Sequence, residues 1–125
     1  MPVSNTSLPV FNQADALTRL LNDDGILRAL VTNVLPMIPV SNRSLSEACQ
    51  RGDYQQAEKI VHSFRGAAAN TGAQRLTHHL CQFELHLKAG QTVEAGELLP
   101  VIEQNSQELI VSLNAYMQSE TSPVA

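Results

Sequence analysis

Apolar residues in this chain recur at every third or fourth position over several successive stretches, and they nowhere alternate with polar residues over a strand's length. That spacing places them along one side of an α-helix. Aromatic residues make up only 4% of the chain and tryptophan is absent, so the core must be built from aliphatic side chains, which favours helices. We therefore predict an all-α fold. One of these stretches carries Ile26, Leu27, Leu30, Val31, Val34 and Leu35.

Capping residues predict where the first three helices begin. Asn12 is a typical N-cap, and we expect it to open a short helix that extends to Leu21. Asp23 or Asp24 can cap a second helix. Asp53 has a glutamine three residues later, which predicts a capping box at the start of a third helix.

The last two helices are predicted at residues 73–88 and from Thr92 onward. Gly90 closes the first of these, and Thr92 is the expected cap of the second. Pro100 lies inside the last stretch. The missing N–H of a proline costs least in the first turn of a helix. We therefore expect the first turn of this helix near Glu97.

Two prolines and two glycines are expected to bend or end the chain. Pro36 and Pro39 fall within the second helical stretch, so we expect a kink or a break there. Gly52 follows the end of this stretch, and Gly72 suggests a tight corner after the third helix. All connections are short, which implies antiparallel neighbours in an up-and-down bundle.

Length and charge limit the number of domains and the classes of function. A chain of 125 residues suits one domain, which we place at residues 11–118 between tails at 1–10 and 119–125. The net charge of -4 argues against nucleic-acid binding, which needs a basic surface. No apolar stretch is long enough for membrane insertion, and no signal-peptide pattern is visible. With only two cysteines, we expect a cytoplasmic protein.

One face of the third predicted helix carries chemistry. His62, Arg65, Gly66 and Ala69 share it, at offsets of three, four and seven residues. The imidazole is a nucleophile near neutral pH, and the arginine can neutralise an acquired phosphoryl group. A glycine inside a helix costs about 1 kcal/mol, which close approach of another chain would explain. We expect a partner to contact this face, including Ser63.

A carboxylate is expected to orient the imidazole. If the chain reverses near Gly72, His62 and Glu84 lie at similar heights on antiparallel helices, and Glu84 can accept the Nδ1–H of the histidine. Glu58, four residues before the histidine, is the rival for this role. The remaining histidines show no zinc-binding spacing, so we expect no metal site and predict a polar helix face for them, with Cys81 in the core.

The run from His62 to Gly72 resembles the signature of histidine-containing phosphotransfer (HPt) domains. The family pattern is a histidine, two residues, a basic residue, a glycine, small residues and a second glycine, and it continues here in Leu76, Leu80, Cys81 and Glu84. The resemblance extends over about residues 8–117 and is similar to modules at the end of bacterial hybrid sensor kinases. The basic residue is usually lysine in the family and is Arg65 here.

This resemblance implies an antiparallel up-and-down four-helix bundle with a short additional N-terminal helix. It implies that His62 accepts a phosphoryl group from a receiver-domain aspartate and passes it to another receiver aspartate, with Arg65 and Glu84 assisting. No ATP site or cofactor is implied for this domain, and Mg²⁺ would be bound by the receiver. A hybrid sensor kinase in cis is a further implied partner, in which case the domain would be the cytoplasmic part of a membrane-anchored protein. The alternative is a helical interaction module that docks a receiver without transferring phosphate.

Overall fold

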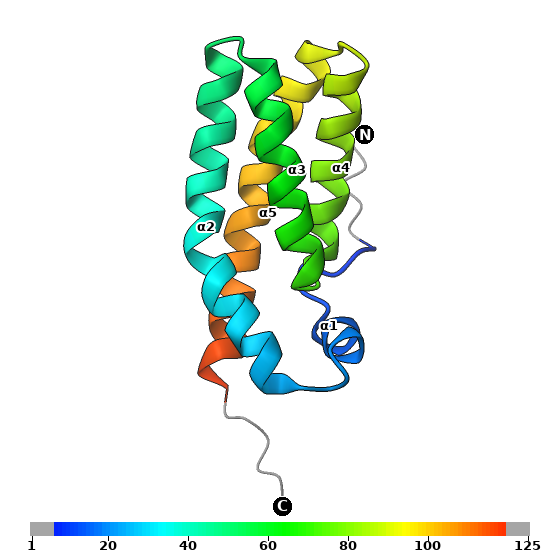
Figure 1. The fold of residues 1–125 in the computed structure, drawn as a ribbon, viewed down its shortest axis with the longest axis vertical. Coiled ribbons are helices and arrows are strands. Elements are labelled where there is room, and N and C mark those ends of the chain that lie inside the picture. The colour runs from blue at the N-terminus through cyan, green and yellow to red at the C-terminus, as the bar shows by residue number, and fades with distance from the viewer. Residues whose placement is uncertain (1–6, 120–125) are drawn as a thin grey trace, which may run out of the picture.

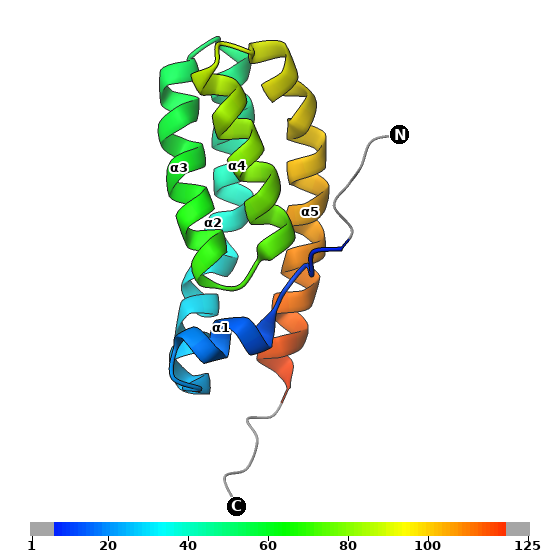
Figure 2. The ribbon, with the colours of Figure 1, turned by 90° about the vertical axis from the view of Figure 1, so that its right-hand side faces the viewer.

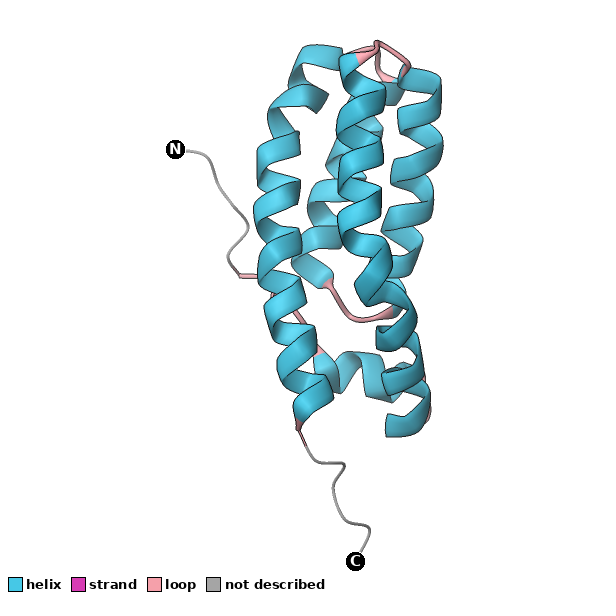
Figure 3. Ribbon diagram, turned by 90° about the vertical axis from the view of Figure 1, so that its left-hand side faces the viewer, coloured by secondary structure: helices cyan, strands magenta, loops and turns pink. Residues whose placement is uncertain are grey.

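The computed structural model describes residues 7–119, and within them the chain forms five helices and no strand. Figure 1 shows four of them side by side along the long axis, with the short first helix across one end. Short loops join them, as Figure 3 shows. The predicted all-α, up-and-down four-helix bundle with an additional N-terminal helix is confirmed. The helices are α1 (Gln13–Arg19), α2 (Asp24–Gln50), α3 (Tyr54–Asn70), α4 (Gln74–Lys88) and α5 (Thr92–Gln118).

The core lies between α2, α3, α4 and α5 and is almost entirely aliphatic. Its two largest buried side chains are Phe64 of α3 and Phe83 of α4. Each fully buried side chain of this size contributes roughly 1.5–3 kcal/mol of hydrophobic free energy. The other large side chains that are fully buried in this core are Leu27, Val31, Ile38, Leu45, Val61, Leu76, Leu80, Ile102, Leu109 and Leu113.

Three helices begin at the predicted capping residues. The side chains of Asn12, Asp23 and Asp53 each accept a hydrogen bond from the backbone N–H three residues later, at 3.0–3.1 Å. These caps satisfy N–H groups that have no partner inside the helix. The choice between Asp23 and Asp24 therefore falls on Asp23.

The predicted end of α1 is wrong. The helix ends at Arg19 rather than Leu21, and both Leu21 and Asn22 adopt left-handed backbone conformations with φ of 57° and 62°. Asparagine tolerates this region, whereas leucine does so at a cost. The left-handed pair turns the chain sharply enough for α2 to start at Asp24.

The two prolines bend α2 without breaking it. The helix is continuous through Pro36 and Pro39, and Figure 1 shows its axis changing direction in the cyan section. Both prolines are exposed, while Val34 and Ile38 between and beside them are buried. Apolar packing on the inner side therefore holds the helix together across the two missing N–H groups.

The predicted start of the last helix near Glu97 is also wrong. α5 begins at Thr92, with Gln91 rather than Thr92 at the N-cap position, and Pro100 lies well inside the helix. Ala95 before the proline and Ile102 after it are both fully buried. Packing on both sides of Pro100 therefore keeps the segment helical despite the lost hydrogen bond.

Gly72 forms the corner between α3 and α4 and lets α1 approach closely. Its φ is +78°, and a Cβ atom there would lie 2.7 Å from the carbonyl oxygen of Asn12 and 3.1 Å from the Cβ of Ala16. The backbone N–H of Asn12 donates to the Gly72 carbonyl at 2.8 Å. The predicted tight corner is confirmed, and it also anchors the first helix.

We expect Gly72→Ala to lower the free energy of unfolding by about 2 kcal/mol, because it combines backbone strain with a steric clash against α1. Urea denaturation followed by circular dichroism measures this. Gly52→Ala is the matched control: its φ is +71° but its Cβ would meet nothing within 4 Å, so the loss should be smaller. Equal losses at both glycines would show that the contact with α1 contributes nothing.

The segment before α1 packs against the bundle. The carbonyl oxygens of Leu8 and Pro9 accept hydrogen bonds from Arg75, and Val10 and Phe11 pack against the core. Figure 2 shows this segment beside α4 and α5. The rest of the expected tails, residues 1–6 and 120–125, lies outside the described residues. Within residues 7–119, none of the five helices combines the length and the apolar character that a membrane span requires.

Candidate functional site

His62 is presented to solvent from the middle of α3. Val61 and Phe64 are buried in the core, so the helix turns the intervening histidine outward. Its side chain is 68% exposed. The imidazole is therefore accessible on the side of the bundle.

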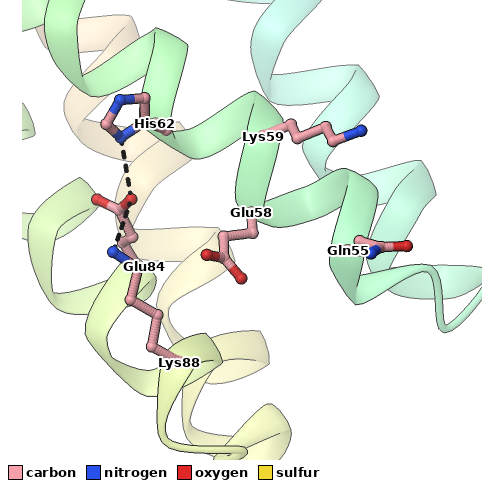
Figure 4. Close-up of a pocket in the computed structure, with 6 residues that line it drawn as sticks. All are labelled: Gln55, Glu58, Lys59, His62, Glu84 and Lys88. Atoms are coloured by element: carbon pink, nitrogen blue, oxygen red, sulfur yellow. Dashed lines mark hydrogen bonds and ion pairs between the residues drawn. The ribbon is translucent and has the colours of Figure 1, made fainter.

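Glu84 of α4 lies directly beside this imidazole and is buried. Its side chain is 7% exposed, and its Oε2 atom lies 3.1 Å from Nδ1 of His62. Figure 4 shows the contact, with the second ring nitrogen directed away from Glu84. Among the described residues Glu58 makes no hydrogen bond to the histidine, so the geometry favours Glu84 over its rival. When Nδ1 carries the proton, the lone pair of Nε2 is free.

Two cations surround the Glu84 carboxylate. The Arg65 Nε atom lies 3.0 Å from Oε1, and the Lys88 Nζ atom lies 3.6 Å from Oε2. The Arg65 Nη2 atom also lies 3.2 Å from Nδ1 of His62. Sequence reasoning missed Lys88, although its position four residues after Glu84 on the same helix was a usable signal.

A hollow of about 530 Å³ opens between α3 and α4 beside the histidine. Glu58 and Lys59 line it from α3, and Lys88 lines it from α4, as Figure 4 shows. The hollow lies on the Nδ1 side of the imidazole, so the opposite nitrogen faces away from it. Its charged lining offers contacts to a polar partner at the rim of the site. The residues that line it are Gln55, Glu58, Lys59, His62, Glu84 and Lys88.

The helix surface one turn after His62 is nearly bare. Gly66 is exposed, and a Cβ atom built on it would meet nothing within 4 Å. Packing inside this domain therefore does not require a glycine there. Ser63 is exposed, and Ala69 is half-buried with its carbonyl accepting a 2.9 Å hydrogen bond from Arg19. The predicted contact surface is thus accessible around Gly66.

The prediction that the other histidines form a polar face is wrong for His79. It is only 3% exposed, and neither ring nitrogen has a hydrogen-bond partner. Burial, with smaller contributions from His78 and Arg75, lowers its pKa. Cys81, predicted for the core, is only half-buried, and its Sγ atom lies 3.9 Å from Nη1 of Arg65. The described residues contain no group of three or more potential ligands arranged for a metal ion.

We expect the buried His79 to make stability depend on pH. Its pKa is lowered in the folded state, so the unfolded chain binds the proton more readily below the ordinary pKa of about 6.5. Stability is therefore fully present above pH about 6.5 and falls as the pH decreases toward the lowered value. His79→Leu should remove this part of the pH dependence, as urea denaturation across this range would measure. A variant with the same pH profile as the native chain would contradict it.

The chain was compared with known protein families. The family model described as "Hpt domain" matches residues 26–115. The matched region contains all of α3 and α4, and with them the site around His62 and Glu84. No curated protein and no solved structure matched the chain.

Proposed function

The chain belongs to the Hpt domain family, and from that premise we propose that His62 is its phosphoryl-accepting residue. Members of this family carry out histidine phosphotransfer in two-component phosphorelays and interact with receiver domains. We propose that His62 accepts the phosphoryl group from a receiver aspartate and passes it to the aspartate of another receiver. The observation that carries this proposal is an exposed imidazole whose Nδ1 lies 3.1 Å from a buried carboxylate.

The proposed step uses the lone pair of Nε2. This nitrogen attacks the phosphorus of the aspartyl phosphate, the N–P bond forms, and the bond from phosphorus to the aspartate oxygen breaks. The aspartate leaves as a carboxylate, and the ring becomes a phosphorylated imidazolium that keeps its proton on Nδ1. The buried Glu84 accepts a hydrogen bond from this proton and stabilises the positive ring. Transfer to the second receiver reverses these bonds.

The other groups of the site neutralise the charge of the phosphoryl group and leave room for the receiver. Arg65 is within reach of the histidine and offers a fork of donors for the phosphoryl oxygens. Lys88 adds a second positive charge near the same carboxylate. We propose that Mg²⁺ and the remaining catalytic groups come from the receiver, because positioning and charge neutralisation dominate phosphoryl transfer. The bare surface at Gly66 would admit the receiver.

The proposal extends to the setting of the reaction. Both cysteines are free thiols, which suits a cytoplasmic location. A hybrid sensor kinase linked in cis is one source of the donor receiver. Each of these is supported by the family and by the composition of the chain rather than by a contact in the structure.

Transfer from a phosphorylated receiver tests the function. We expect the protein, mixed with a ³²P-labelled receiver and Mg²⁺, to acquire a label that is lost in acid and stable in base, as a phosphorylated histidine requires. Mass spectrometry of the labelled protein should place the group on the peptide that contains His62. Binding of the receiver without any label would instead support a module that docks but does not transfer.

A further inference from the structure

The Nδ1 atom of His62 lies within hydrogen-bond distance of two groups that make opposite demands on it. Oε2 of Glu84, at 3.1 Å, is a carboxylate oxygen and can only accept a hydrogen bond. Nη2 of Arg65, at 3.2 Å, can only donate one. A ring nitrogen either carries a proton or offers a lone pair, so it can bond one of these neighbours but not both.

We propose that Arg65 and Glu84 compete for this nitrogen, and that their competition sets the fraction of His62 in the reactive tautomer. When Nδ1–H donates to Glu84, Nε2 has a free lone pair and can attack phosphorus. When Nδ1 accepts from Arg65, the proton lies on Nε2 and the nitrogen cannot attack. Arg65 is thus a positioning residue that holds back the nucleophile in the unphosphorylated domain. This inference rests on the proposed function of His62.

The guanidinium of Arg65 is free enough to compete. Its Nε atom lies 3.0 Å from Oε1 of Glu84, yet this N–H makes no aligned hydrogen bond. Its Nη1 atom has only a weak contact, 3.9 Å from Sγ of Cys81. Because a guanidinium presents several donors in one plane, it can lie beside the carboxylate and reach the ring at the same time. A single lysine ammonium, usual at this position in the family that the sequence resembles, offers one donor centre instead.

Other charged groups near the imidazole act only indirectly. The Nζ atom of Lys88 lies 3.6 Å from Oε2 of Glu84, the oxygen that faces the ring. Its positive charge weakens the hydrogen bond that this oxygen accepts from Nδ1–H. Glu58 and Lys59 line the adjacent hollow, and no described hydrogen bond joins either of them to the ring. The direct competition therefore involves Arg65 and Glu84.

Phosphorylation would end the competition. Once Nε2 is bonded to phosphorus, the proton stays on Nδ1, which can then only donate to Glu84. The N–H donors of Arg65 can then no longer bond to Nδ1, but they can bond to the phosphoryl oxygens on the same imidazole. We therefore expect the hydrogen bond of Arg65 to move from the ring to the phosphoryl group. No proton is released in the transfer step, because the ring keeps its proton on Nδ1.

Nitrogen NMR of the unphosphorylated protein tests the competition. With ¹⁵N-labelled histidine at mildly alkaline pH, the chemical shifts of the two ring nitrogens report which of them carries the proton. His62→Gln identifies the signals of His62. We expect Arg65→Met to shift the tautomer ratio toward Nδ1–H by about five-fold, the effect of one net hydrogen bond. Arg65→Lys, which keeps a cation for Glu84, should shift it in the same direction.

Lys59→Met is the matched control, because it removes a nearby positive charge that makes no hydrogen bond to the ring. We expect no change of the tautomer ratio in this variant. An unchanged ratio or a shift toward Nε2–H in both Arg65 variants would overturn the inference, as would an equal shift in Lys59→Met. If the ratio shifts as expected but no receiver labels His62, the proposed function fails while the competition stands. Labelling of His62 with a ratio insensitive to Arg65 refutes the competition alone.

Discussion

His62→Gln should abolish phosphoryl uptake from a labelled receiver, with any residual label at the background of the assay. A glutamine amide has no nucleophilic lone pair on nitrogen, so it cannot form the N–P bond. The native side chain is 68% exposed, so the fold loses little, and we expect the free energy of unfolding to change by less than about 0.5 kcal/mol. Transfer is followed by gel autoradiography, and stability by urea denaturation.

His78→Gln gives the matched comparison for this result. It replaces a half-buried histidine of α4 that lies outside the residues lining the hollow, and its transfer should equal that of the native chain. A label that persists in His62→Gln would assign the phosphoryl group to another residue. Loss of label in both variants would show that the loss is not specific to His62, and would not assign the phosphoryl group to this residue.

Helix starts could be predicted well because they depend on neighbours close in sequence. The caps at Asp23 and Asp53 need only a side chain and an N–H three residues away, and both were found at the predicted positions. The predicted start of α5 near Glu97 was wrong because it rested only on the N–H group that Pro100 lacks. The buried Ala95 and Ile102 on either side of it hold α5 together, and such packing against other helices is not visible in a local pattern.

The candidate site could be predicted in part for the same reason. Glu84 was found by assuming that two antiparallel helices bring residues 62 and 84 to one height, which the observed distance of 3.1 Å supports. Lys88 was not predicted, although it lies one helical turn after Glu84 and forms an ion pair with it. His79 follows Leu76 by three residues and precedes Phe83 by four, so its burial was encoded in the same periodicity that located the core.

Substitutions at Gly66 give the second large effect: alanine there should stabilise the fold, and tryptophan there should slow transfer. Because a Cβ there meets nothing within 4 Å and the residue lies inside α3, Gly66→Ala should raise the free energy of unfolding by about 1 kcal/mol. A large side chain would extend from this exposed position and would stand one turn from His62 on the bare surface. We expect Gly66→Trp to slow transfer on the order of 100-fold, because a displacement of about 1 Å at the reacting atoms has that effect.

The comparison that decides this prediction is Gly96→Trp. Gly96 is also inside a helix, α5, and its Cβ would also meet nothing within 4 Å, but α5 does not carry the site. This variant should transfer at the native rate, as quench-flow measurements with a labelled receiver would show. If Gly66→Trp also transferred at the native rate, the receiver would approach His62 without closing over α3, and the glycine would have no role in docking. A slow Gly66→Trp beside a native Gly96→Trp would place the receiver directly over the bare turn of α3, where the absence of a side chain costs stability and permits contact.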